Sequence, residues 1–158
     1  GRMADEAGLR VATYPHDNTY VETTLHGLKV AGKTGRDNVG VSYNLCHSLK
    51  AGNADRMEEI LKKAAPRLFL VQVNGAIKDG EDWADEGWDK LIRPLDSNEF
   101  DLQGMLTTLV EIDYSGPICL MPYGIDLPPR EHLSRSMERW KELRRTLRKA
   151  HTPAEGRN

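Results

Sequence analysis

The sequence predicts an α/β fold built on a parallel sheet, because short apolar runs alternate with amphipathic stretches along the chain. Four runs rich in β-forming residues occupy residues 9–14, 39–45, 68–73 and 117–121. A helical pattern follows each run, and strands that alternate with helices at this spacing pair in parallel through right-handed crossovers. We therefore expect four βα units over residues 1–150, followed by a disordered tail over residues 151–158.

The strands differ in how clearly they are marked. The third run, residues 68–73, is almost continuously apolar, which is typical of a strand buried on both faces. Gly8 precedes the first run and is suited to close a short helix that ends near Ala7.

Helices are expected at about residues 21–32, from a cap at Asn53 or Asp55 to Pro66, from Asp101 to about Ser115, and at about residues 130–150. Their apolar residues recur on one face. Residues 74–100 form a polar segment too long for a simple connection, which favours a functional loop or short helix there.

Composition excludes several classes of protein. The 158 residues carry a formal net charge of −2 with interspersed charges, so we expect neither nucleic acid nor a membrane surface as a partner. No apolar stretch approaches the roughly 20 residues that span a bilayer. The start is not a signal peptide, and the cellular location is left open. Cys46 and Cys119 both lie in apolar runs and are expected to be buried free thiols.

Two closures of the sheet fit this spacing: an open doubly wound sheet, or half of a (β/α)8 barrel. A full barrel needs about 200 residues or more. No G-x-G-x-x-G and no G-x-x-x-x-G-K-[ST] follows a strand, so a nucleotide-binding open sheet has little support.

The candidate site lies at the carboxyl ends of the strands, where parallel α/β folds bind ligands. Amide and imidazole side chains stand at these ends: His16, Asn44, His47, Gln72 and Asn74. Amides both donate and accept hydrogen bonds and suit a polyhydroxylated ligand. The alternatives are structural: the histidines could bond to the backbone, Asn44 and Gln72 could form a polar layer, and Asn74 could serve only a turn.

The long segment adds three candidates. Trp83 and Trp88 could stack on a sugar ring or simply pack the loop. Arg93 could meet a phosphate or carboxylate, or form a salt bridge within the loop.

The strand ends resemble strands five and six of the xylose-isomerase-like barrel family. The resemblance rests on residues 11–16 and 39–47, which read VATYPH and VGVSYNLCH. Residues 68–75 resemble strand seven, and residues 116–120 with 130–133 resemble the last strand and helix. The similarity covers about residues 4–147 and implies a (βα)4 half of a TIM barrel.

The resemblance also implies a divalent metal, such as Mn or Mg, held by two Glu, one Asp and one His. The corresponding positions are Tyr14, Asn44, Gln72 and Met121, and none of them keeps its ligand. We therefore expect no metal cofactor, because such cations need charged oxygen ligands. The histidines that accompany the ligands, His16 and His47, are kept and become the candidate catalytic residues.

Three functions remain open at this stage: a metal-free isomerase or epimerase homologue acting on a carbohydrate, a degenerate member that binds a sugar without turnover, and an interaction module. In the first two, the expected substrate-binding residues are Tyr14, Asn44, Gln72, Asn74, Trp83 and Arg93. In the third, another segment or chain completes the barrel. Two open strand edges also predict a homo-oligomer, a larger assembly or a marginally stable sheet.

Overall fold

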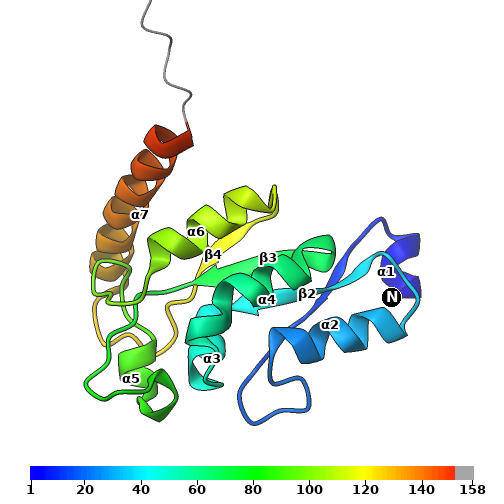
Figure 1. Cartoon of the computed structure of the whole chain (residues 1–158), viewed down its shortest axis with the longest axis horizontal. Helices are drawn as coiled ribbons and strands as arrows, with labels where there is room; N and C mark the ends of the chain where they lie inside the picture. Colours follow the sequence, from blue (N-terminus) through cyan, green and yellow to red (C-terminus); the bar gives the residue numbers. More distant parts are fainter. Residues whose placement is uncertain (152–158) are drawn as a thin grey trace, which may run out of the picture.

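The computed structural model describes residues 1–151 and contains one sheet of four parallel strands (Figure 1). The strands are β1 (Val11–Thr13), β2 (Val39–Asn44), β3 (Leu68–Val73) and β4 (Ile118–Leu120). They lie in chain order, β1-β2-β3-β4, as expected for successive βα units. The α/β fold with its half-barrel order of elements is therefore confirmed. Of the predicted tail, His151 is the last residue of a helix, and residues 152–158 lie outside the described part of the chain.

The pairing register brings the carboxyl ends of the strands together. Thr13 pairs with Val41, and Asn44 pairs with Gln72, which in turn pairs with Cys119. Residues that pair in a parallel sheet point to the same face. The side chains just beyond each strand end therefore share one edge of the sheet.

The helical elements between and around the strands are α1 (Arg2–Glu6), α2 (Thr24–Lys33), α3 (Leu45–Lys50), η1 (Ala54–Arg56), α4 (Met57–Ala64), η2 (Ala65–Arg67), η3 (Trp83–Asp85), α5 (Trp88–Leu91), α6 (Leu102–Glu111) and α7 (Pro129–His151). Helices α2, α4 and α6 lie in a row along one face of the sheet, and α7 continues the row beside α6 (Figure 1).

The core lies between this row and the sheet. Val41, Tyr43, Val71 and Val73 face the helices and are buried, and α4 and α6 contribute their apolar faces to the same cluster. Alternation along a strand then places Gly40, Ser42 and Asn44 on the opposite face.

That opposite face is only partly covered. The β2–β3 register shifts between Val41 and Ser42, so that one extra residue, Phe69, is accommodated in β3. The Phe69 ring lies over Gly40, where a Cβ would come within 2.6 Å of it. Leu70 and Gln72 on this face are half-buried. The face that would line the interior of a barrel is thus partly open in this chain.

Three points of local structure differ from the expectations. Cys46 is buried as predicted, but Cys119 is exposed, because it lies on the edge strand β4 and points away from the helices. Helix α3 was not predicted: the chain turns into a helix at Leu45, directly after β2, where the sequence was interpreted as a strand end. Neither predicted cap is present: Asn53 precedes η1 without a side-chain capping bond, and Asp55 lies within η1, while Arg56 precedes α4.

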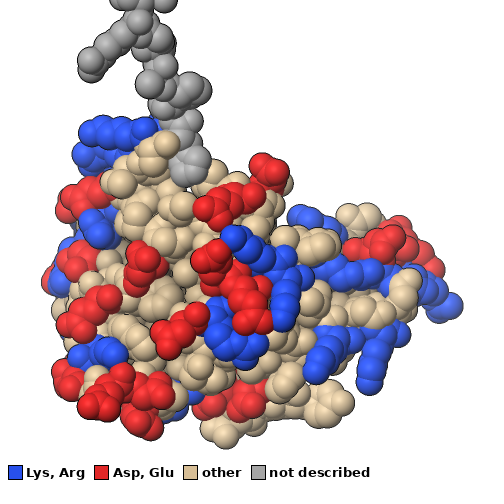
Figure 2. Space-filling view, viewed as in Figure 1, with Lys and Arg blue, Asp and Glu red and all other residues tan. Residues whose placement is uncertain are grey.

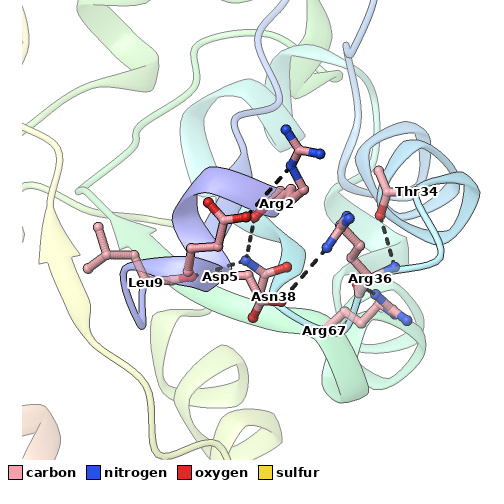
Figure 3. Close-up of polar contacts among 9 residues, drawn as sticks. Arg2, Asp5, Leu9, Thr34, Arg36, Asn38 and Arg67 are labelled. Atoms are coloured by element: carbon pink, nitrogen blue, oxygen red, sulfur yellow. Dashed lines mark hydrogen bonds and ion pairs between the residues drawn. The ribbon is translucent and has the colours of Figure 1, made fainter.

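At the amino ends of the strands a polar cluster fixes α1 against the sheet (Figure 3). Asn38 donates from Nδ2 to the carbonyl oxygens of Gly1 and Leu9. Arg36 pairs with Asp5, and Arg67 donates to the carbonyl oxygens of Arg36 and Val39. This cluster stabilises the end of the sheet opposite the candidate site.

Acidic and basic side chains are mixed over the surface that carries α4 and α6 (Figure 2). Lys62 pairs with both Glu58 and Glu111, which joins the two helices. Exposed pairs of this kind contribute roughly 1 kcal/mol or less each. None of the helices in residues 1–151 has the length and hydropathy needed to cross a bilayer.

The cap of α6 provides a direct stability test. The Asp101 carboxylate accepts a hydrogen bond from the backbone N–H of Gly104 at 2.8 Å, as its position in the sequence predicted. We expect Asp101→Ala to lower the free energy of unfolding by about 1 kcal/mol, measured by urea denaturation, because this N–H loses its partner. The matched control is Asp55→Ala, an exposed site, and an equal loss in both variants would contradict the capping role.

Candidate active site

A cavity of about 500 Å³ opens at the carboxyl ends of the strands. It is lined by the residues that follow β1, by the first turn of α3, by the loop before α6 and by the segment after β4: Tyr14, His16, Asp17, Asn18, Cys46, His47, Trp88, Ile92, Met121 and Tyr123. This volume is typical of a small-molecule site. Its walls therefore come from all four βα units.

The buried amide of Asn44 organises the floor of this region. Only 1% of the Asn44 surface is exposed. Its Nδ2 donates to the hydroxyl of Tyr14 and, at 3.1 Å, to Oε1 of Gln72, while its Oδ1 accepts from the Cys46 thiol at 3.1 Å. Three neighbouring strand ends are thus joined by one side chain, and both Asn44 N–H groups are used inside the protein.

These residues do not fit a hard divalent cation. Tyr14, Asn44 and Gln72 supply a phenol and two neutral amides, Met121 supplies a thioether, and the first three are already bonded to one another. Burial first, and then the neighbouring Cys46, raise the pKa of the Tyr14 phenol, so a phenolate ligand is disfavoured. Within residues 1–151, no three His, Cys, Asp or Glu side chains gather as a metal-binding group.

Two imidazoles lie side by side in the cavity, tilted to each other. The ring centroids of His16 and His47 are 4.1 Å apart, with an angle of 39° between the planes. The edge of Trp88 contacts His47 at 5.1 Å between centroids, and Tyr14 contacts it at 5.9 Å. The aromatic rings thus enclose His47, which is only 6% exposed, whereas His16 is exposed.

The surroundings hold His47 neutral. Burial lowers its pKa to about 4, the neighbouring His16 acts in the same direction, and Asp17 opposes them. Burial also raises the pKa of the Cys46 thiol to about 12, so this cysteine is a poor nucleophile. Cys46 is therefore a poor candidate for proton transfer, which leaves the two imidazoles as candidates.

The long segment over residues 74–100 folds tightly onto the site. Gly75 and Arg93 exchange two backbone hydrogen bonds of 2.8 Å. A Cβ on Gly75 would lie 2.0 Å from the carbonyl oxygen of Pro94, so only glycine fits there. Lys50 of α3 donates to the carbonyl oxygens of Ala84 and Glu86. These contacts position α5, which carries Trp88 into the cavity wall.

The structure brings most of the predicted site residues to the cavity or directly beneath it. His16, His47 and Tyr14 line the cavity, and Asn44 and Gln72 lie in the hydrogen-bonded row beneath Tyr14.

The other three predicted residues, Asn74, Trp83 and Arg93, do not line this cavity. Asn74 is fully buried and donates to the carbonyl oxygens of Gly75 and Leu91, which anchors the loop. Trp83 packs against Phe100. Arg93 lines a smaller neighbouring cavity of about 230 Å³, which also includes Asp126 and Arg135.

The sequence did not single out Asp17, Cys46 or Tyr123 as site residues. Their only signal was their place just after an apolar run, which they share with many loop residues. Cys46 enters the wall because α3 begins immediately after β2. That turn was not predicted.

Parallel βα units with a ligand-sized cavity at the strand ends define the class: half of a (β/α)8 barrel with a candidate site where such barrels bind ligands. A family model described as "Xylose isomerase-like TIM barrel" matches residues 1–149, and the chain belongs to this family. A comparison with curated proteins found no match.

Solved structures share the fold at low identity. The IOLI protein with a bound zinc atom is 19% identical, with a TM-score of 0.71, over 90% of this chain and 51% of that one. A D-tagatose 3-epimerase-like protein is also 19% identical, with a TM-score of 0.71, over 96% and 52%. A xylose isomerase-like TIM barrel protein from Mycobacterium smegmatis in complex with magnesium is 17% identical, with a TM-score of 0.67, over 96% and 49%. The chain spans about half the length of these proteins.

The low pKa of His47 predicts how stability depends on pH. In the unfolded chain this imidazole has a pKa of about 6.5 and binds a proton before the folded chain does. The contribution of neutral His47 is therefore fully present above that pH and is lost as the pH falls towards 4. We expect the loss to be at most about 3 kcal/mol, and smaller in His47→Gln.

The measurement is urea denaturation at several pH values between these limits. His26→Gln, at an exposed position on α2, is the matched control and should keep the wild-type slope. A wild-type slope in His47→Gln would contradict the assignment.

Proposed function

We propose that this chain binds a carbohydrate in the cavity at its strand ends and acts as a sugar isomerase- or epimerase-like protein, with His16 and His47 as the proton-transfer groups. The observation that carries the proposal is the pair of adjacent imidazoles in a cavity of about 500 Å³. Membership of the xylose isomerase-like family supports it, as does the similarity to the structures of a D-psicose 3-epimerase and an L-ribulose 3-epimerase.

The cavity wall has the chemistry that sugar binding needs. Tyr14, Trp88 and Tyr123 offer aromatic surface to the C–H face of a sugar. The Tyr14 hydroxyl and the imidazole nitrogens can exchange hydrogen bonds with ligand hydroxyl groups. Asn44 and Gln72 act chiefly by fixing the position of Tyr14.

The remaining predicted contacts are weaker. Arg93 is within reach only of a ligand that extends into the adjacent cavity, which shares Ile92 with the first. Asn74 and Trp83 support the loop that carries Trp88.

We infer that this function does not use a resident divalent metal. The donor set is neutral, and its hydrogen bonds would have to break for a cation to enter. A proton-transfer reaction would then depend on imidazole, which is the usual general acid–base group near neutral pH. Zinc and magnesium are bound in two of the similar structures.

A panel of ketohexoses and aldohexoses tests both points by thermal shift and calorimetry. We expect saturable stabilisation by at least one sugar, equal in EDTA and in Mn²⁺. His47→Ala should weaken binding by about tenfold, the cost of roughly one buried hydrogen bond, whereas His26→Ala should bind normally. Stabilisation that requires Mn²⁺ would overturn metal independence, and unchanged binding by His47→Ala would place the ligand elsewhere.

A second candidate function is that of an interaction module whose barrel is completed by another segment or chain. The partly open sheet face favours it: Leu70 and Met121 are half-exposed, and Cys119 is exposed. Strands β1 and β4, at the two edges of the sheet, each have three residues. Exposed edges of this kind invite pairing.

Cys119 reports on this second candidate. If the face stays open, we expect one thiol per chain to react rapidly with an aromatic disulfide reagent, because Cys46 is buried, and the reaction should disappear in Cys119→Ala. Sedimentation should then give a monomer. Protection of Cys119 that increases with protein concentration, together with a dimer in sedimentation, would instead favour the interaction module.

A further inference from the structure

One peptide unit contacts both imidazoles of the site. The backbone N–H of Asp17 donates to Nδ1 of His47 at 3.2 Å, and the carbonyl oxygen of Asp17 lies 2.7 Å from Nδ1 of His16. The turn that carries Asp17 is itself held in place. His16 donates its N–H to the carbonyl oxygen of Val21, and Thr19 Oγ1 donates to the carbonyl oxygen of His16.

These two contacts demand opposite proton positions. An amide N–H can only donate, so Nδ1 of His47 must carry a lone pair and its proton must lie on Nε2. A carbonyl oxygen can only accept, so Nδ1 of His16 must carry the proton, and its neutral ring keeps the lone pair on Nε2. The two adjacent rings are therefore different tautomers.

The free nitrogen of each ring remains available. Neither Nε2 atom has a hydrogen-bond partner in the described chain, and neither is among its buried unpaired polar atoms. Both rings line the cavity. A bound molecule thus meets one N–H donor on His47 and one acceptor on His16, on rings whose centroids are 4.1 Å apart.

We propose that Asp17 is a positioning residue that acts through its main chain and assigns His16 as the proton acceptor of the site and His47 as the hydrogen-bond donor. This division of roles rests on the proposed function and goes beyond it. A neutral imidazole that donates from nitrogen can polarise a ligand oxygen, and the partner imidazole can take a proton from an adjacent group. A ligand that fits places an acceptor oxygen beside a proton donor.

The test is the tautomeric state of each ring in the sugar-free protein. Long-range ¹H–¹⁵N spectra of histidine-labelled protein report it, recorded well above the usual imidazole pKa of about 6.5. We expect His16 to hold its proton on Nδ1 and His47 on Nε2, each in about fivefold excess, since one hydrogen bond sets each choice. The exposed ring of His26 supplies the unrestrained reference in the same spectra.

Two variants separate the main chain of Asp17 from its side chain. Asp17→Ala keeps both backbone groups and should keep both tautomers. Asp17→Pro lacks the N–H and should release His47 while His16 keeps its state. If the proline variant does not fold, the wild type and the alanine variant still decide the question.

The outcome is independent of sugar binding. A His16 ring with the tautomer preference of His26 would overturn the assignment even if a sugar binds. A change of tautomer in Asp17→Ala would show that the carboxylate acts in place of the main chain, which also overturns it. Opposite tautomers without sugar binding would leave this inference standing and remove the proposed function.

Discussion

The amide of Asn44 is the interaction on which the site depends. It lies at the carboxyl end of β2, is almost fully buried, and is bonded to Tyr14, Gln72 and Cys46. A buried amide without partners would cost several kcal/mol, so the three strand ends can hardly move apart without losing that compensation. Tyr14 is held by this amide and is followed by the turn with His16, while α3 with His47 begins directly after Asn44.

This arrangement also fills the region beneath the cavity with neutral groups. The residues beneath the cavity satisfy one another and leave no free carboxylate, while burial keeps Cys46 a thiol and His47 uncharged. The region where the family resemblance implies a cation is instead a closed hydrogen-bonded row. Aromatic rings and two imidazoles make up half of the residues that line the cavity, and Asp17 is the one carboxylate among them.

Much of the fold could be predicted because its signals are local. The continuous apolar run of residues 68–73 marked β3 with its observed bounds, and Asp101 marked the start of α6. Helix α3 could not be predicted, because the residues after Asn44 continue the apolar run and no turn residue marks the change. The exposure of Cys119 depends on which strand lies at the sheet edge and on what covers its inner face. The residues next to Cys119 in the sequence determine neither the position of its strand in the sheet nor the cover of that face.

The candidate site, like the fold, could be predicted only in part. The rule that parallel sheets bind ligands at their strand ends was enough to predict that Tyr14, His16 and His47 lie together, and all three line one cavity. The placement of Asn74 and Trp83 depended on how the segment over residues 74–100 folds back, and that fold is set by distant partners such as Lys50. Long-range contacts of this kind produce no repeating pattern in the sequence from which they could be predicted.

The contacts of Asp17 have a consequence for how such a residue could be discovered. Its N–H and carbonyl oxygen are common to almost every amino acid, so most substitutions at position 17 would leave them in place. A saturation library scored for activity would rank this position as tolerant, with proline as the one strong exception. A residue can thus set the protonation of two neighbouring side chains while its own side chain tolerates substitution.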